Sequence, residues 1–239
     1  MKLINGYKVM SKHPTNKNLN IIKATTYNDL PLIKPKYRGA FEFIEEYLNT
    51  NFNVMNNALH THARTLAVRV DLHLPPQTSD GTINTFQEAL ITRFIKSLKS
   101  KIKNYIARNA QNGKRVHCPG VEYIWVCEQG VLKDHYHLVL FLNNDTFRHA
   151  GAKRTGHSSS NLINMIVGAW GSALKVNWDK AWDLVTIPPS ASYRLRNVNV
   201  YDTDYRDLFQ RLSYFAKVKS KVYGGNQNSY GCSRLPRNR

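Results

Sequence analysis

Residues 121–142 read VEYIWVCEQGVLKDHYHLVLFL and contain two apolar, aromatic-rich runs, VEYIWV (121–126) and HYHLVLFL (135–142). Runs of this length and composition predict β-strands. The residues between them, CEQGVLKD, include Gly130 and suit a hairpin connection. We therefore expect two neighbouring strands here, paired through a hairpin.

Further elements are predicted on both sides of this hairpin. Alternation of apolar and other residues over 66–74 predicts a half-buried strand that ends at Pro75-Pro76. A short strand is expected over 191–196. Helical spacing of apolar residues predicts helices over 37–52, 84–109, 161–174 and 202–220. This order of elements predicts an α+β sheet with helices on one face, of the split βαβ type.

The chain divides into three parts by composition. Residues 1–36 mix Lys, Asn, Thr and Pro with little periodicity and are expected to form an N-terminal arm with at most a short helix or strand. Residues 37–222 hold the predicted helices and strands and form the expected domain. Residues 223–239 are expected to be a loose basic tail.

The net charge indicates a polyanionic partner. The 239 residues include 34 Lys and Arg against 16 Asp and Glu, a formal net charge of +18. Such an excess concentrates polyanions, of which nucleic acid is the commonest, although a basic protein need not have a specific ligand.

The composition also bears on the class of protein. Hydrophobic residues at 42% and charged residues at 21% argue against wholesale disorder and against a coiled rod.

Nothing in the sequence predicts a membrane protein or a disulfide framework. No run of eighteen apolar residues is present, and the N-terminus lacks an apolar run of signal-peptide length. Cys118, Cys127 and Cys232 are an odd number and too few for a disulfide framework. We therefore expect a reducing, cytoplasmic setting and no membrane partner.

The second strand of the hairpin carries a His-x-His pattern that is suited to a metal. His135 and His137 project from the same face of a strand, so both imidazoles can reach one ion. Glu128 ends the preceding strand and would add a carboxylate oxygen if the hairpin closes as predicted. Two nitrogens, one oxygen and open positions suit Mg²⁺ or Mn²⁺ bound together with a substrate phosphate.

Two alternatives to this metal site remain open at the level of the sequence. A pair of strand histidines can simply line a polar sheet face. A zinc site that uses His117, Cys118 or Cys127 is also conceivable, because thiolate and imidazole are zinc ligands. Cys127 should alternate away from Glu128, however, and His117-Cys118 lacks the paired spacing of a zinc knuckle.

The last predicted helix contains RLSYFAKVKSK, residues 211–221. On a helix, Tyr214 and Lys217 share a face, with Arg211 one turn earlier. Taken alone, this is an ordinary amphipathic pattern. Combined with a metal, it is sufficient for phosphodiester cleavage, because an ammonium favours the phenolate of a tyrosine whose usual pKa is about 10.

The segments YIWVCEQG, DHYHLVLFLN, NMIVGAWGSAL, RLSYFAKVKSK and GCSR together resemble the replication-initiator-like proteins of filamentous phages (inoviruses) and prophages. These belong to the HUH endonucleases, and the resemblance covers roughly residues 60–235. It implies a central antiparallel sheet, with His135 and His137 as metal ligands on a middle strand and Glu128 as a third ligand. It also implies Tyr214 as the single nucleophile on a packed helix, with Lys217 as its partner. Tyr136 departs from the aliphatic middle residue of the motif.

The resemblance implies an enzyme that nicks and rejoins single-stranded DNA at a specific site through a 5′-phosphotyrosyl intermediate. Such an enzyme initiates rolling-circle replication of a phage or mobile element. Its partners would be single-stranded or hairpin DNA and host replication proteins. Arg211, Lys219 and Lys221 are candidate DNA contacts, as are the lysines of the 84–109 helix as a group. The alternative is a non-catalytic DNA-binding regulator or origin-binding protein on the same fold, and an RNA binder with an RRM-like sheet is a third reading.

Overall fold

The central element is a six-stranded antiparallel sheet. The computed structural model describes residues 3–4, 7–37, 39–75, 87–128, 135–151, 161–197, 201–219 and 228–236. The strands of this sheet are β7 (Arg64–His73), β8 (Glu122–Glu128), β9 (His135–Asn143), β10 (Val185–Thr186), β11 (Ser192–Arg196) and β12 (Tyr230–Cys232). Their order is β10–β7–β9–β8–β12, and β11 also pairs with β7. The α+β class and the paired β8 and β9 strands are therefore confirmed.

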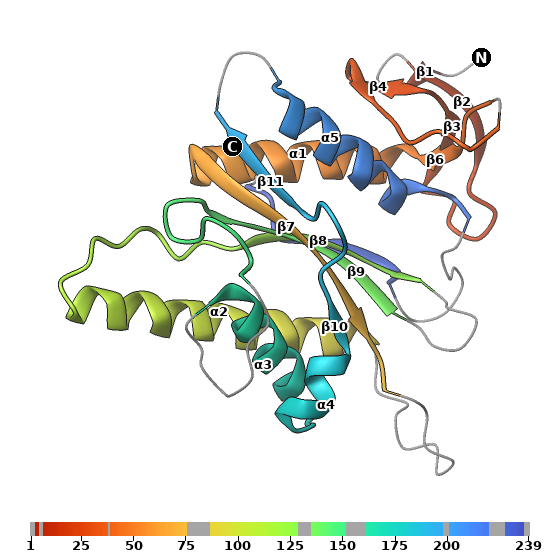
Figure 1. Ribbon diagram of the computed structural model, residues 1–239. Helices are drawn as coiled ribbons and strands as arrows, with labels where there is room; N and C mark the ends of the chain where they lie inside the picture. The colour runs from red at the N-terminus through yellow and green to blue at the C-terminus, as the bar shows by residue number, and fades with distance from the viewer. Residues whose placement is uncertain are drawn as a thin grey trace, which may run out of the picture.

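Helices cover both faces of this sheet (Figure 1). On one face lie α2 (Gln87–Gln111), α3 (Leu162–Leu174) and α4 (Trp178–Asp183). On the other lie α1 (Glu45–Thr61), α5 (Thr203–Ser213) and the 3₁₀ turn η1 (Tyr214–Ala216). The expectation of helices on one face was wrong. The reason lies in β9, whose Leu138 and Leu140 are buried on one side while Val139 and Phe141 are buried on the other.

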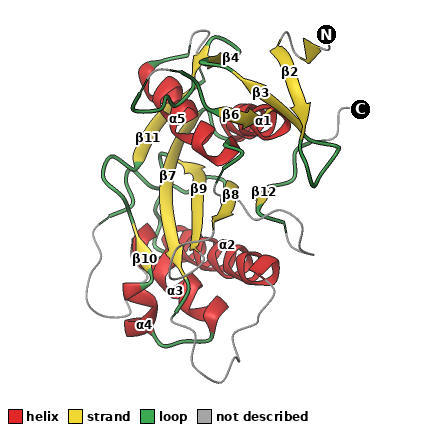
Figure 2. Cartoon of the chain, turned by 90° about the vertical axis from the view of Figure 1, so that its right-hand side faces the viewer, coloured by secondary structure: helices red, strands yellow, loops and turns green. Residues whose placement is uncertain are grey.

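The N-terminal residues form a second sheet instead of an arm. Its strands are β1 (Leu3–Ile4), β2 (Tyr7–Lys12), β3 (Asn20–Lys23) and β6 (Glu42–Ile44), and a hairpin of β4 (Thr26–Tyr27) and β5 (Leu30–Pro31) lies beside it. Figure 2 shows this sheet next to α1 and α5, away from α2 and α3. Tyr27, Leu30 and Leu32 are fully buried in the same core as α5. The arm predicted for residues 1–36 is thus part of the folded unit.

Two of the predicted helices have different bounds. The helix predicted over 37–52 begins only at Glu45, because Phe43 and Ile44 pair with β3 as strand β6. The helix predicted over 202–220 ends at Ser213 and continues as η1 to Ala216. Its apolar residues Leu208, Leu212 and Phe215 are all fully buried.

The remaining elements lie close to their predicted positions. The strands over 66–74 and 191–196 and the helix over 161–174 are confirmed within two residues as β7, β11 and α3. The helix predicted over 84–109 is α2, and its first three predicted residues lie outside the described part of the chain. The tail predicted over 223–239 instead contributes β12, which pairs with β8. No helix within the described residues has the length and apolar character needed to cross a membrane.

Candidate active site

Three potential metal ligands converge at one end of the central sheet. Strand β9 lies between β7 and β8, so His135 and His137 lie on a central strand. Glu128 of β8 is directly opposite His135 in the register of the pair. The Nε2 atoms of the two histidines are 3.2 Å apart, and Nε2 of His137 is 3.2 Å from Oε2 of Glu128. The side chains of Glu128 and His137 are buried, whereas His135 is partly exposed.

The donor set fits a divalent metal ion. Glu128, His135 and His137 each offer one ligand atom, and these atoms lie within 4.8 Å of one another. The Nδ1 atom of His137 is engaged by Asp71, which leaves Nε2 to present its lone pair to the other two ligands. Lone pairs that face one another at such distances need a cation or a proton between them. The triad could therefore hold a metal through two nitrogens and one oxygen.

Strand β7 supplies a half-buried carboxylate beside this triad. Asp71 lies opposite His137 in the register, and its Oδ1 accepts a hydrogen bond from Nδ1 of His137 at 2.7 Å. Arg69 donates to the same oxygen from Nε at 3.2 Å. Nη2 of Arg69 also lies 3.0 Å from Nδ1 of His137, but the shorter carboxylate contact assigns the Nδ1 proton. Asp71 thus fixes the orientation of the His137 ring.

The charges of these groups shift two pKa values in opposite directions. Burial alone would lower the pKa of His137, but its hydrogen bonds to Asp71 and Glu128 outweigh this and raise it. Burial alone would raise the pKa of Asp71, but the hydrogen bond and charge of His137 and the charge of Arg69 outweigh this and lower it. The contact between His137 and Asp71 contributes to both shifts, because each group favours the charged form of the other.

We predict that Asp71→Asn weakens metal binding without unfolding the protein. An amide cannot offer a charged acceptor to Nδ1 of His137, so the ring is less firmly oriented, and the affinity for Mn²⁺ should fall by ~10- to 100-fold. Isothermal titration calorimetry measures this. Asp145→Asn is the matched control, because Asp145 is also paired with an arginine, Arg64 at 2.8 Å. Equal affinities of the two variants would contradict the positioning role of Asp71.

Tyr214 reaches the triad from a different part of the chain. Its hydroxyl donates a hydrogen bond to Oε2 of Glu128 at 2.9 Å, and its ring centroid is 5.8 Å from that of His137. The side chain is partly exposed, so a ligand at the triad can also reach the phenolic oxygen. Burial of Leu212 and Phe215 on both sides of Tyr214 fixes η1 against the sheet. The structure therefore brings Tyr214, Glu128, His135 and His137 together.

Lys217 lies beside Tyr214, although not on a shared helix. Its backbone is extended and forms a bridge with Phe43 of β6. A 3₁₀ turn repeats every three residues, so positions 214 and 217 still lie on the same side. The ammonium of Lys217 is 5.0 Å from the centroid of the Tyr214 ring and 4.1 Å from that of Phe41. The lysine is thus in contact with two aromatic rings, one of them from the N-terminal region.

The three candidate DNA contacts, Arg211, Lys219 and Lys221, do not form one surface in the described residues. Arg211 turns away from the triad and donates hydrogen bonds to the carbonyl oxygens of Pro189 and Ser190 and to the hydroxyl of Tyr193. It therefore links α5 to the segment before β11. Lys219 is exposed two residues beyond Lys217. Lys221 lies outside the described residues.

The alternative zinc site is not assembled in the described residues. Cys127 is buried on the α2 and α3 side of the sheet, opposite to Glu128, and Cys118 is exposed.

Tyr136, the middle residue of the His-x-His pattern, also lies on the α2 and α3 side of the sheet. It is fully buried, and its ring packs edge-to-face against Trp125 and Trp170.

Four side chains near the triad were not identified from the sequence. Arg69, Asp71 and His73 alternate with the apolar residues of β7, and the ring of His73 stacks on that of His135 with centroids 5.6 Å apart. The signal for these three was present, since RVDLH places polar residues on one face of a predicted strand. Phe41 gave no such signal, because its contact with Lys217 depends on how the N-terminal sheet packs.

Comparisons with known proteins identify similar chains. The profile of the YagK/YfjJ C-terminal domain family matches residues 22–233, which is wider at both ends than the predicted domain of 37–222. Uncharacterized protein YfjJ of Escherichia coli strain K12 is 33% identical over 189 residues, 76% of this chain and 90% of the relative. Uncharacterized protein YagK of the same strain is 33% identical over 199 residues, 80% of this chain and 94% of the relative. No solved structure matches the chain.

Proposed function

This chain belongs to the YagK/YfjJ C-terminal domain family, and we propose that it nicks and rejoins single-stranded DNA at a specific site with Tyr214 as nucleophile and a divalent metal. One observation carries the proposal, the hydrogen bond of 2.9 Å from the Tyr214 hydroxyl to Glu128. This bond places the phenolic oxygen of Tyr214 at the edge of the candidate metal site.

The topology supports the resemblance to HUH endonucleases. The order of elements along the chain is β7, α2, β8, β9, α3 and β10, which is that of a split βαβ fold. In the sheet, their strands lie in the order β10–β7–β9–β8. Both α2 and α3 pack on one face of the sheet. The triad lies on the opposite face of the sheet. In an HUH enzyme, the metal ligands are expected on the face that α2 and α3 leave uncovered. A fold alone hosts many functions, so the site carries the greater weight.

The residues of the site would divide the chemistry among them. Glu128, His135 and His137 would hold Mg²⁺ or Mn²⁺, which when bound withdraws charge from the scissile phosphate. The phenolic oxygen of Tyr214 attacks phosphorus, the bond to the 3′ oxygen breaks, and that oxygen leaves with a proton from solvent. The phenolic proton passes toward Oε2 of Glu128, its acceptor in the structure, and then to solvent. Lys217 places a positive charge beside the ring as its negative charge develops.

Rejoining uses the same residues in the reverse direction. The 5′ end of the cut strand is held on Tyr214 as a phosphodiester, so the energy of the broken bond is retained. A free 3′ hydroxyl that enters the site attacks phosphorus and releases Tyr214. This chemistry suits the initiation of rolling-circle replication of a phage or mobile element. The net charge of +18 supports a nucleic acid as the substrate.

A denaturing gel tests the proposed function. The full chain is incubated with labelled single strands of its own genetic element and Mn²⁺, and the expected result is a protein–DNA band that survives denaturation. Binding without such a band on either strand would instead favour the non-catalytic, origin-binding alternative.

We predict that Phe41 positions Lys217 for this reaction. Phe41→Leu removes the aromatic face under the ammonium at 4.1 Å, and the rate of adduct formation should fall by ~3- to 10-fold, whereas Phe41→Tyr should retain it. The measurement is a single-turnover time course. In a Lys217→Ala background, Phe41→Leu should have no further effect, because the group that it positions is absent. An equal decrease in both backgrounds would show that Phe41 acts only through stability.

A further inference from the structure

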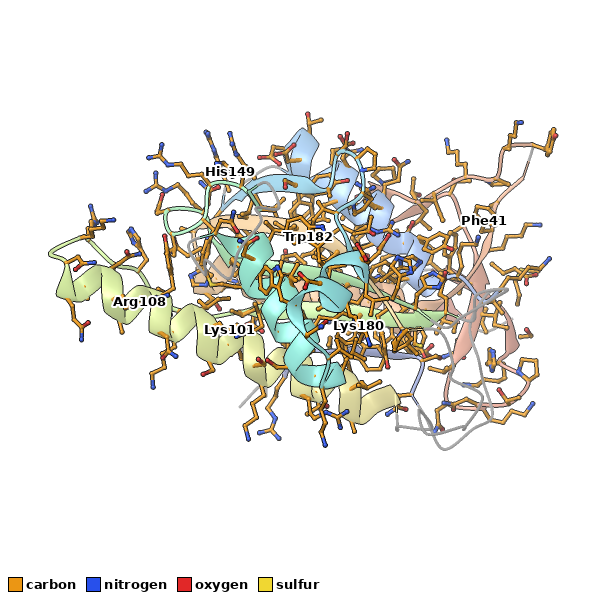
Figure 3. The ribbon with its side chains drawn as sticks, turned by 60° about the horizontal axis from the view of Figure 1, so that its bottom comes forward. Phe41, Lys101, Arg108, His149, Lys180 and Trp182 are labelled. Carbon is orange, nitrogen blue, oxygen red and sulfur yellow. The ribbon has the colours of Figure 1, made fainter. Side chains whose placement is uncertain are left out.

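The outer side of α2 carries a concentration of positive charge. Residues 89–115, which include most of α2 and the turn after it, contain eight Lys and Arg and no Asp or Glu. All but one of these eight are exposed. Figure 3 shows α2 extending across the molecule with Lys101 and Arg108 along it, and α4 with Lys180 and Trp182 near it. This side is on the face of the sheet opposite to the triad.

A pocket of about 400 Å³ opens between α2, α3 and α4 beside this charge. Its polar and aromatic lining comes from Lys101, Lys175, Asn164, Ser172 and Trp178. No acidic residue is among the described residues that line it. Gly168 forms part of its floor, where an added Cβ would lie 3.2 Å from the Trp178 ring and 3.5 Å from Nζ of Lys101. Because Gly168 has no side chain, the space between the Trp178 ring and the Lys101 ammonium stays open.

We propose that this pocket binds one unpaired nucleotide of a DNA strand whose neighbouring phosphates lie along α2. The volume is suited to a nucleotide, the partly exposed Trp178 offers a surface for a base, and Lys101 and Lys175 offer charges for a phosphate. A duplex would meet the lysines of α2 equally well, but its stacked bases could not enter a pocket. The occupant is therefore a single strand. The inference rests on the proposed function only for the identity of the polymer as DNA.

Packing contacts through α3 and β7 link the pocket to the candidate active site. Gly171, which lines the pocket, follows Trp170 in α3. The indole N–H of Trp170 donates to the carbonyl oxygen of His73 at 3.0 Å, and the ring of His73 stacks on that of His135. On this proposal, a strand that leaves the triad passes around the β10 edge of the sheet to reach the pocket. Such a contact would hold DNA that flanks the nick.

Fluorescence anisotropy tests this inference. Labelled oligothymidine is titrated with the full-length Tyr214→Phe protein in EDTA, so that no cleavage is required. Lys101→Ala with Lys175→Ala should weaken binding by ~10-fold and reduce the slope of log affinity against log salt by ~1.4. The matched control is Lys17→Ala with Lys23→Ala, which removes the same charge from exposed positions in the turn between β2 and β3 and at the end of β3. A loss no greater than that of the control would overturn the proposal.

Two further comparisons distinguish binding of a nucleotide in the pocket from simple attraction of DNA to the positive charge of α2. Trp178→Leu should weaken single-strand binding by ~5-fold or more, and Trp178→Phe should retain most of the affinity. A duplex of the same length should not respond to Trp178→Leu, and an equal response of both DNA forms would overturn the proposal. The proposed enzymatic function can fail independently of the pocket. In that case the unmodified protein forms no covalent adduct, but the pocket variants still weaken binding.

Discussion

Tyr214→Phe is expected to abolish the covalent protein–DNA adduct while DNA binding stays near that of the unmodified protein. The substitution removes only the phenolic oxygen, the atom that would attack phosphorus, so the rate of adduct formation should fall by ~10³-fold or more. The ring packs beside His137 in either case, and loss of one hydrogen bond should cost only ~1 kcal/mol of folding free energy. Denaturing gels measure the adduct, and anisotropy measures binding.

The control for this variant is Tyr201→Phe. Tyr201 is 38% exposed and stacks on Tyr205, away from the triad, so its hydroxyl has no part in the proposed chemistry. The unmodified protein and Tyr201→Phe should form equal amounts of adduct. If Tyr214→Phe cleaves DNA at a rate close to theirs, Tyr214 is not the nucleophile.

His137→Ala should remove metal-dependent cleavage. The substitution deletes the central ligand of the triad, and the rate in Mn²⁺ should fall by ~10²-fold or more, to the level reached by the unmodified protein in EDTA. Asp71 retains its ion pair with Arg69 at 3.2 Å. The buried Glu128 retains the hydrogen bond from the Tyr214 hydroxyl, so both carboxylates keep a polar partner after the substitution. Cleavage time courses with and without Mn²⁺ measure the effect, and circular dichroism confirms the fold.

His149→Ala serves as the control for the removal of an imidazole. His149 is exposed and follows the end of β9 opposite to the one that carries the triad. It should retain full stimulation by Mn²⁺. Persistence of that stimulation in His137→Ala would rule out the metal role of the triad.

The hairpin and its ligands could be predicted because they depend on local sequence. The period of two in HYHLVLFL places His135 and His137 on one face whatever the rest of the chain does, and the hairpin brings Glu128 opposite His135. Asp71 could not be assigned in the same way. Its contact with His137 depends on which strand pairs with the other edge of β9, and the sequence of β7 does not specify that neighbour.

The N-terminal region shows the limit of periodicity more clearly. The spacing of Phe41, Phe43, Ile44 and Leu48 predicts a helix, but Phe43 and Ile44 pair with β3 and only Leu48 lies in α1. Tertiary pairing overrides local spacing here, because a strand partner is available that the local pattern does not reveal. Tyr214 and Lys217 were expected together on a helix and lie together on a 3₁₀ turn and the residue that follows it. Their spacing of three residues brings them together in either structure.

The most direct test of the proposed function is to identify the residue that carries the DNA. The adduct formed with a single strand of the element in Mn²⁺ is digested with nuclease and protease, and the modified peptide is sequenced by tandem mass spectrometry. We predict a nucleotide joined through its 5′ phosphate to the hydroxyl of Tyr214. Attachment to any other residue, or recovery of the Tyr214 peptide only in its unmodified form, would contradict it.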